Sequence, residues 1–510
     1  MVPQGPAPGN RALQHSFTVA NGAAATASPL IADALAELLH VEVDEWPQHG
    51  LEPIKRRTVR SVFRGRLGGI DVHVKVFRAD TLADRARDAV RTGKGRREAE
   101  NLLRARALDL PAVEPLAFGT ALSGAHHCSL LVTRSLAAEP FTFPADDGIA
   151  ARTGALLRRL HDLGVEPTDL HPGNVLVTAA GEPILCDLTS LRHAGELTLR
   201  RRAAGLAFFC NPIDGGPLDP LTRSFRRGYE QPGRALPEAF LAELARASRR
   251  LRAAALRSFG RRSERPCRHT EVEPRRRATP RWFLHRGDGG VDDELQAACR
   301  AFDASANEPR RSGRRGGIWL TDAFAVKRRD PGKARKLWRA HYWLSFARVP
   351  AATPLALCLD RGQGLVFTRV AGPRDLATEI ATGALDAAAI ARTATALGHA
   401  IGRLHGHGLR NRDLKFDNLV RDADSGEVRI VDLDGVTLHA ADDTRGTGRD
   451  LGRLLAAFRT AGEPGGSASL RRFVRAYYRA RRRLLQRPPM QRILRRAEQR
   501  AGEWAAAHNR

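Results

Sequence analysis

The chain contains one phrase twice, as PTDLHPGNVLV at residues 167–177 and as NRDLKFDNLV at residues 411–420. In each copy an Asp is followed directly by Leu, and an Asn stands five residues after the Asp, ahead of an apolar segment. A phrase this short is informative only if the sequence around it is repeated as well.

Four further pairs of segments accompany the phrase in the same order in both halves of the chain. They are VHVKVF and AFAVKR around Lys75 and Lys327, PAVEPLA and PAATPLA at 111–117 and 350–356, RLHDLG and RLHGHG at 159–164 and 403–408, and ILCDLTSLR and RIVDLDGV at 184–192 and 429–436. The order and spacing agree so closely that chance is excluded. The chain is a tandem duplication of a unit of about 200 residues, and such internal repeats dictate the architecture.

The residue patterns within each unit predict strands first and helices later. Residues 71–77, DVHVKVF, alternate apolar and polar side chains, as a half-buried strand does. Residues 95–107 and 151–164 have apolar residues at helical spacing, and the second of these segments ends at Gly164, a helix-stop signal. NVLVT and PILCDL flank the turn AAGEP and predict a hairpin. We therefore expect an α+β fold with a small antiparallel sheet followed by helices in each unit.

A chain of 510 residues is too long for one ordinary core, so two domains are expected. The Ala-, Pro- and Gly-rich start predicts a flexible tail followed by a short helix. An irregular, arginine-rich stretch predicts a linker that leads into the second domain. The expected boundaries are residues 1–50 for the tail and helix, 51–257 for the first domain, 258–315 for the linker and the start of the second domain, and 316–510 for the rest of it.

The net charge of +27 calls for an anionic partner to be considered. Only seven of the 83 basic residues are lysines, however, and the chain is rich in Ala and Gly as well as Arg. That composition indicates a bias across the whole sequence and not a designed patch. No zinc-finger, RNA-recognition or basic-zipper pattern accompanies the charge, so a nucleic acid is an unlikely partner.

The six cysteines are scattered without metal-ligand spacing, which predicts free thiols in a reducing compartment. The first residues lack the pattern of a secretory signal. No stretch has the roughly 18–20 apolar residues that span a bilayer. We expect a cytoplasmic protein that contacts the inner face of the membrane peripherally.

The repeated landmarks supply the groups that phosphoryl transfer from ATP requires. A strand lysine can pair the phosphates, a carboxylate can deprotonate the acceptor hydroxyl, and an amide and a second carboxylate can hold Mg²⁺. In the first half these are Lys75, the base Asp169, and the metal ligands Asn174 and Asp187. In the second half the same roles fall to Lys327, Asp413, Asn418 and Asp432.

Ordinary structural roles compete with this interpretation. A strand lysine is usually an exposed charge, and an Asp in a loop is usually a turn or cap residue. Lysine is nearly absent from this chain, however, and it occupies the matching position twice. His161 and His405 are expected to be structural, since they stand on the packing face of a helix, while the role of His171 is left open.

These residues resemble the protein-kinase-like superfamily over residues 55–235 and 315–480. RNRDLKFDNLV followed by IVDLDGV is similar to the bacterial lipopolysaccharide kinase (Kdo/WaaP) family, and so are RREAENLL and ARKLWRAHYWL. The resemblance implies two tandem bilobal domains, each with a small sheet lobe followed by a helical lobe. It also implies phosphorylation of sugars in the lipopolysaccharide core.

The resemblance also implies that a helix glutamate holds the strand lysine, and Glu98 takes this place in the first half. Leu337 stands at the matching position of the second half, which has no acidic residue from 333 to 348. Lys415 in the repeated phrase is a further candidate for contact with the nucleotide. Neither half has a convincing glycine-rich loop, and FRGRLGG (63–69) and GRRGGIW (313–319) are weak candidates.

Neither half shows the long segment after the metal-binding Asp on which peptide substrates of protein kinases dock. We therefore expect an enzyme that uses ATP and Mg²⁺ to phosphorylate a sugar hydroxyl of lipopolysaccharide core or a related glycan. Its partners would be ATP and an anionic glycan or glycolipid. Two alternatives remain open: an atypical protein serine/threonine kinase, and an ATP-binding pseudokinase or regulatory protein in which one half is inactive.

Overall fold

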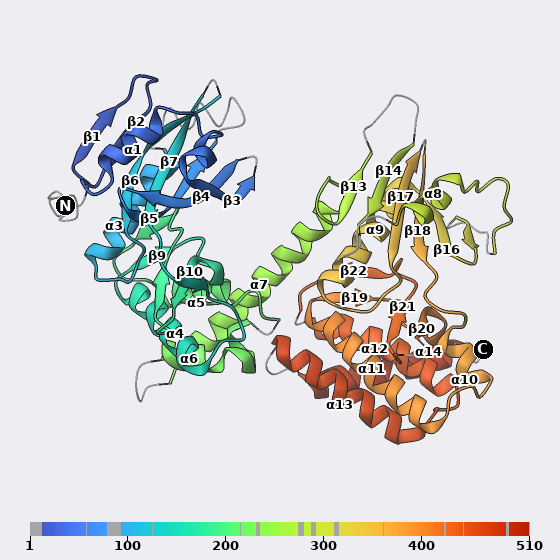
Figure 1. The fold of residues 1–510 in the computed structure, drawn as a ribbon. Helices are drawn as coiled ribbons and strands as arrows, with labels where there is room; N and C mark the ends of the chain where they lie inside the picture. Colours follow the sequence, from blue (N-terminus) through green and yellow to red (C-terminus); the bar gives the residue numbers. More distant parts are fainter. Residues whose placement is uncertain are drawn as a thin grey trace. The chain divides into compact units, whose positions relative to one another are not determined.

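The chain divides into two compact units, residues 1–248 and residues 249–510 (Figure 1). Both are mixed α/β units with antiparallel sheets. The computed structural model describes residues 13–57, 59–78, 93–124, 126–214, 216–230, 235–273, 280–286, 292–310, 316–360, 362–422, 425–441, 443–485 and 489–508.

Unit 1 begins with a seven-stranded antiparallel sheet in the order β1-β2-β6-β7-β5-β4-β3. Its strands are β1 (His15–Thr18), β2 (Ala24–Ala27), β3 (Leu51–Arg57), β4 (Arg60–Leu67), β5 (Ile70–Phe77), β6 (Pro115–Ser123) and β7 (His126–Arg134). Val72, Val74 and Val76 of β5 share a buried core with α1 (Ala32–Leu39) and with Trp46 of η1 (Trp46–His49). Because side chains alternate along a strand, Lys75 points to the opposite face of the sheet.

The start of the chain differs from the predicted tail. Residues 1–12 lie outside the described residues, but β1 and β2 belong to the sheet, and β2 pairs with β6. Ala23, Ala25 and Ala27 are buried on one face, and their small side chains fit the close approach of Ala25 to Gly119. The Ala-rich composition was misleading because small residues also suit a tightly packed strand.

The rest of unit 1 is mainly helical, as predicted. It contains α3 (Lys94–Ala107), α4 (Asp147–Asp162), α5 (Leu199–Phe209), α6 (Arg223–Tyr229) and α7 (Glu238–Arg262), the 3-10 turns η2 (Pro172–Asn174), η3 (Gly216–Leu218) and η4 (Pro220–Thr222), and the short strands β8 (Ala138–Pro140), β9 (Val165–Pro167), β10 (Val175–Thr178), β11 (Pro183–Leu185) and β12 (Leu191–His193). The division between the units falls within α7. The predicted hairpin is confirmed, since β10 pairs with β11 in antiparallel register. Gly164 adopts a φ of 69° just after α4, as its helix-stop role requires.

Unit 2 has a six-stranded antiparallel sheet in the order β13-β14-β17-β18-β16-β15. Its strands are β13 (Thr270–Val272), β14 (Arg281–His285), β15 (Ile318–Leu320), β16 (Phe324–Arg329), β17 (Pro354–Asp360) and β18 (Gln363–Arg369). The predicted linker 258–315 thus contributes two strands and α8 (Asp293–Ala301) to this unit. The buried Phe283 and Leu284 explain the difference, because this apolar pair anchors β14 against β17 despite the arginines around it.

Helices make up most of the remainder of unit 2. They are α9 (Pro331–Phe346), α10 (Leu376–Ala381), α11 (Ala387–Gly406), α12 (Thr444–Thr460), α13 (Gly466–Leu485) and α14 (Met490–His508), with the 3-10 turn η5 (Phe416–Asn418). Two short ribbons, β19 (Leu409–Asn411) with β22 (Val436–Leu438) and β20 (Leu419–Arg421) with β21 (Val428–Ile430), bracket the repeated phrase.

Two glycines of α11 allow it to pack closely against α13. A Cβ atom on Gly398 would lie 2.4 Å from the carbonyl oxygen of Phe473, and one on Gly402 would lie 2.6 Å from that of Tyr477. Main-chain atoms cannot move aside as a flexible side chain can. We therefore expect Gly402→Ala to lower the free energy of unfolding of unit 2 by about 1–3 kcal/mol, measured by hydrogen exchange of α11 and α13.

Gly502 provides the matched control for this substitution. It lies inside α14, and a Cβ atom there would meet nothing within 4 Å. Gly502→Ala should therefore stabilise unit 2 by up to about 1 kcal/mol through helix propensity alone. A loss of stability at Gly502 as large as that at Gly402 would contradict the packing argument.

Candidate functional site

In unit 1 three predicted residues from distant parts of the chain form one charged cluster. Lys75 Nζ of β5 lies 2.6 Å from Glu98 Oε1 of α3 and 3.4 Å from Asp187 Oδ1, which follows β11. The Glu98 side chain is 0% exposed and that of Lys75 is 15% exposed. The close pairing of the strand lysine with the helix glutamate agrees with the anchoring role implied for Glu98.

Electrostatics favours the charged forms of Lys75 and Asp187, whereas at Glu98 burial outweighs the effect of Lys75 and raises the pKa of the carboxyl group. Burial opposes the charge on Lys75, but Glu98 and Asp187 outweigh it and raise the pKa of the ammonium group. Burial also opposes the charge on Asp187, but Lys75 and Arg60 outweigh it and lower the pKa of the carboxyl group. Arg60 Nη1 of β4 donates to Asp187 Oδ2 at 3.0 Å, a contact that the sequence did not reveal.

The repeated phrase of unit 1 brings Asn174 next to this cluster. The Asn174 side-chain amide donates to the carbonyl oxygen of Asp169 at 2.9 Å, and Cys186 N donates to the carbonyl oxygen of Asn174 at 2.9 Å. Asn174 therefore lies beside the residue that precedes Asp187. Asp187 itself has a φ of 57°, a left-handed backbone conformation rare outside glycine and frequent at functional sites. Asp169 is exposed.

In unit 2 the strand lysine is held differently. Lys327 Nζ of β16 lies 2.8 Å from Asp432 Oδ1 and 3.6 Å from Asp434 Oδ2. Leu337 of α9, at the position of Glu98, is buried in the apolar core. The ion-pair partners of Lys327 thus come from the DLDG segment and not from a helix. These aspartates take the place of the helix glutamate that unit 2 lacks.

Burial tends to raise the pKa of Asp432, but the neighbouring Lys327 ammonium group lowers it by more. The pKa of Asp432 is therefore below its usual value, and its carboxyl group stays charged. Arg329 adds a second cation from the same strand, with Nη2 at 2.6 Å from Asp434 Oδ2. Neither Arg329 nor Asp434 was predicted. The second Asp of DLDG, which the first half lacks, was the available signal.

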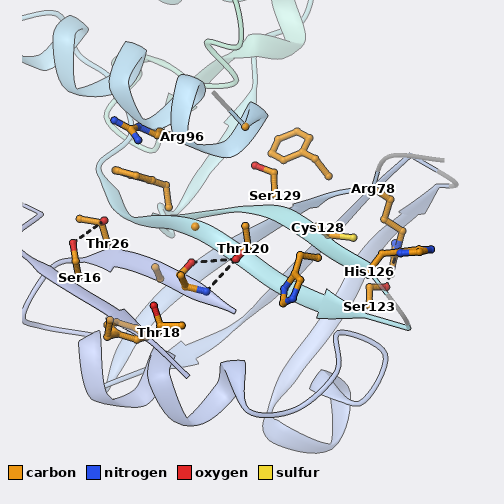
Figure 2. A pocket seen from close by; sticks show the side chains of 18 residues that line it. Ser16, Thr18, Thr26, Arg78, Arg96, Thr120, Ser123, His126, Cys128 and Ser129 are labelled. Carbon is orange, nitrogen blue, oxygen red and sulfur yellow. Dashed lines mark hydrogen bonds between the residues drawn. The ribbon is translucent and has the colours of Figure 1, made fainter. Parts of the chain in front are cut away.

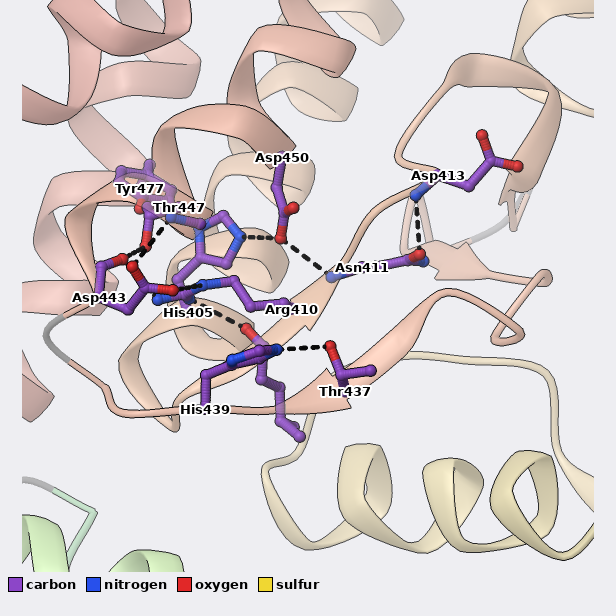
Figure 3. Close-up of polar contacts among 12 residues, drawn as sticks. His405, Arg410, Asn411, Asp413, Thr437, His439, Asp443, Thr447, Asp450 and Tyr477 are labelled. Carbon is purple, nitrogen blue, oxygen red and sulfur yellow. Dashed lines mark hydrogen bonds and ion pairs between the residues drawn. The ribbon is translucent and has the colours of Figure 1, made fainter. Parts of the chain in front are cut away.

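The repeated phrase of unit 2 is more tightly organised than that of unit 1. Asn418 Nδ2 donates to both the carbonyl oxygen and the Oδ2 of Asp413, each at 2.9 Å. Asn411 Oδ1 accepts from Asp413 N at 3.1 Å (Figure 3). Asn411 Nδ2 donates to the carbonyl oxygen of Asp432 at 3.1 Å. Val431 N donates to the carbonyl oxygen of Asn418, which places Asn418 beside Asp432. The loop therefore fixes the Asp413 carboxylate with respect to Asn418 and Asp432.

A buried network supports this loop from behind. Asp450 Oδ2 of α12 accepts from Asn411 N at 3.0 Å and contacts His405 Nε2 at 3.3 Å (Figure 3). His405 Nδ1 lies 3.0 Å from the Tyr477 hydroxyl, and His161 of unit 1 has the same partner type in Tyr229 at 2.7 Å. Burial lowers the pKa of His161 to about 4 and that of His405 well below its usual value. Both histidines are therefore neutral and structural.

Asp450 makes the stability of unit 2 depend on pH. Burial raises its pKa to about 7, against the opposing effect of Arg410, while its ordinary pKa is 3.8. The folded state therefore binds the proton more tightly, and the resulting stabilisation is present below pH 4 and lost as the pH rises to about 7. We compare the free energy of unfolding of the wild type with that of Asp450→Asn. The difference, wild type minus variant, should fall by up to about 4 kcal/mol between about pH 4 and pH 7. Denaturant titrations at several pH values would measure it, and a difference independent of pH would contradict it.

Two other predicted features are not joined to the clusters. Lys415 Nζ lies 3.6 Å from Asp417 Oδ2 within its own loop. FRGRLGG forms the turn between β4 and β5, where Gly68 and Gly69 have positive φ angles, and residues 313–315 of the other glycine-rich candidate lie outside the described residues.

A cavity of about 980 Å³ lies in unit 1 beside α3, lined by residues of β6 and β7 such as Thr120 and Ser129 and by Arg96 (Figure 2). Thr120 Oγ1 accepts from Ala24 N there at 3.0 Å. None of the ten predicted site residues lines this cavity, so we do not place the site in it.

The donor sets of both units suit Mg²⁺, which prefers oxygen ligands and retains positions for phosphate and water. Each unit pairs a carboxylate with a neighbouring amide, and the buried Asp187 Oδ1 has Lys75 Nζ beside it at 3.4 Å. In Asn418 the amide nitrogen is occupied by Asp413, which leaves its amide oxygen for a cation. Among the described residues no group of three or more His, Cys, Asp or Glu side chains forms a metal cage, so substrate oxygens would have to complete the shell.

All six cysteines are free thiols. In the part of the chain that the structure describes, no helix combines the length and the apolar character needed to cross a bilayer. No protein-family model matches the chain, and a search of curated proteins gave no match. Function must therefore be inferred from the two clusters of side chains.

Proposed function

We propose that the protein is an ATP-dependent phosphotransferase that phosphorylates a sugar hydroxyl of a lipopolysaccharide core or related glycan. In this proposal each unit is a bilobal kinase-like domain, with the sheet and α3 or α9 as the first lobe and the later helices as the second. The observation that carries it is the juxtaposition, in both units, of a strand lysine, a carboxylate and a neighbouring loop Asp–Asn pair.

The residues divide the work of the transfer between them. Asp413 orients the acceptor hydroxyl and accepts its proton while the acceptor oxygen bonds to the γ-phosphorus and the bond to the leaving ADP breaks. Lys327 contacts the phosphates, and Asn418 and Asp432 hold Mg²⁺, which neutralises phosphate charge when bound. In unit 1 the same roles fall to Asp169, Lys75, Asn174 and Asp187, with Glu98 positioning Lys75.

A glycan acceptor is favoured over a peptide by the short segment after each metal-binding Asp. In unit 2, α12 begins at Thr444, twelve residues after Asp432. In unit 1, α5 begins at Leu199, twelve residues after Asp187. This spacing leaves little chain for a peptide-docking segment. The resemblance to lipopolysaccharide kinases favours the same acceptor class.

A second candidate function is regulatory, with one unit acting as a pseudokinase. The buried Leu337 in place of a helix acid favours this role for unit 2. The hydrogen bond between the Asn418 and Asp413 side chains favours an active unit 2 instead. Among the described contacts of unit 1, the Asn174 side chain bonds only to the main-chain carbonyl of Asp169.

The test is to incubate the full chain with ATP and Mg²⁺ and, in separate reactions, with lipopolysaccharide core oligosaccharide, with a general protein substrate, or with no acceptor. Mass spectrometry should find one added phosphate on the oligosaccharide. Phosphate found only on protein would favour the atypical protein kinase. ATP binding without any product would favour the pseudokinase.

A further inference from the structure

A groove of about 960 Å³ in unit 2 lies between the first turns of α12 and the last turns of α14. Seven arginines and three acidic residues line it, together with His439, Gly446, Gln499 and Trp504. Figure 3 shows part of its wall around Arg410, Asp443 and Asp450. We call it the arginine groove, defined by Arg410, Arg412, Arg445, Arg449, Arg453, Arg496 and Arg500.

The charges of the arginine groove are not balanced from within. Arg410 lies 3.5 Å from Asp443, and Arg500 lies 3.0 Å from Glu503. Asp450 is buried and faces Asn411 and His405. Exposed Arg445 and Arg449 have no carboxylate partner among the described residues, while Arg412 interacts electrostatically with Asp450. The wall therefore presents at least two uncompensated guanidinium groups, those of Arg445 and Arg449, to one concave surface.

Asp413 does not line the arginine groove, but two of the groove's residues, Arg412 and Arg453, adjoin it. Arg453 Nη2 lies 3.8 Å from Asp413 Oδ1, and its guanidinium group stacks 4.7 Å from the Trp504 ring. Arg412 is the residue before Asp413. A ligand bound in the groove and extending past Arg453 would therefore approach the Asp413 carboxylate.

We propose that the arginine groove is an acceptor subsite that binds the anionic groups of the acceptor, so that the substrate of unit 2 is a glycan already carrying two or more phosphate or carboxylate groups. This inference rests on the proposed function, because it places the acceptor at Asp413. Guanidinium groups bind phosphate and carboxylate through paired, charge-assisted hydrogen bonds. Several of them around one cavity select a ligand with several anions, and a neutral glycan would leave them unpaired.

The test compares binding of phosphorylated core oligosaccharide, freed of its lipid, with the same oligosaccharide after enzymatic dephosphorylation. Calorimetry on the full chain at low salt should give a Kd about tenfold or more lower for the phosphorylated form. Arg445→Gln/Arg449→Gln should remove most of this preference. Both positions are exposed, so the variant should fold, and salt should weaken binding to the wild type more than to the variant.

Arg472→Gln/Arg475→Gln is the matched control. It removes the same charge from exposed positions of α13 that do not line the groove. This control should keep the affinity of the wild type for the phosphorylated oligosaccharide.

Equal affinity of the wild type for both oligosaccharides would overturn the inference, and so would an equal loss in the two double variants. If Arg445→Gln/Arg449→Gln lost binding to phosphatidylglycerol vesicles but bound the glycan as the wild type does, the groove would contact a membrane instead. The proposed function is tested separately by transfer. Anion-selective binding without transfer would contradict the kinase proposal, whereas transfer to a neutral glycan would contradict only the acceptor subsite.

Discussion

Replacing Asp413 with Asn is expected to lower the kcat of phosphoryl transfer by unit 2 by about 10²–10⁴-fold, the usual contribution of a positioned general base. The amide keeps the size of the carboxylate and can still accept from Asn418 Nδ2, which donates to Asp413 Oδ2 at 2.9 Å. It cannot accept the proton of the acceptor hydroxyl. Steady-state kinetics in a chain that already carries Asp169→Asn would isolate the contribution of unit 2.

Asp417→Asn is the control from the same loop. Asp417 is 60% exposed, and its contact is Lys415 at 3.6 Å, so its loss should change kcat by less than about twofold, as expected for a surface pair. Similar kinetics for Asp413→Asn and Asp417→Asn would remove Asp413 from the mechanism. Unchanged thermal unfolding of both variants would establish that the comparison concerns chemistry and not folding.

Lys75→Met is expected to destabilise unit 1 by about 3–5 kcal/mol, because removing one partner of a buried ion pair leaves the other without compensation. Glu98 is 0% exposed and would lose its ion-pair partner, while Asp187 would keep Arg60. The double variant Lys75→Met/Glu98→Gln should recover most of this stability by removing the stranded charge. Hydrogen exchange of β4, β5 and α3 would measure both effects.

Lys327→Met is the corresponding substitution in unit 2, and we expect it to reduce stability less than Lys75→Met does. The Lys327 side chain is 16% exposed, but Asp432 is 31% exposed and Asp434 keeps Arg329. The loss of stability should therefore be smaller than for Lys75→Met, about 1–2 kcal/mol, between the values of buried and exposed pairs. Equal destabilisation by Lys75→Met and Lys327→Met would contradict the difference that we describe between the two lysine environments. Both variants should lose affinity for ATP in the unit concerned.

Most of the elements and site residues that could be predicted from the sequence came from its internal repeat. Matching spacings assigned Lys75 and Asp187, and likewise Lys327 and Asp432, to one site in each half, and the structure brings each pair together. Periodicity was sufficient for β5 and for α3 and α4, since their apolar residues follow strand and helix spacing. Alignment of the halves also placed Leu337 where Glu98 stands.

Other features depend on contacts that no local pattern encodes. The anchoring of Lys327 by Asp434 requires the DLDG turn to face β16, which only the fold determines. The arginine groove joins residues of α12 and α14 to the loop of Asp413, and in a chain so rich in arginine its members do not stand out. The strand that contains Ala25 was not predicted, because an Ala-rich composition is found both in flexible tails and in closely packed strands.

The most direct test of the central claim is transfer of labelled γ-phosphate from ATP to lipopolysaccharide core oligosaccharide by the wild type and by Asp169→Asn/Asp413→Asn. We predict label on the oligosaccharide with the wild type, reduced at least about 100-fold in the double variant. Loss in only one of the single variants would identify the active unit. Equal labelling by the wild type and the double variant, or none by a wild type that binds ATP, would contradict the assignment of these two aspartates as catalytic bases of a glycan kinase.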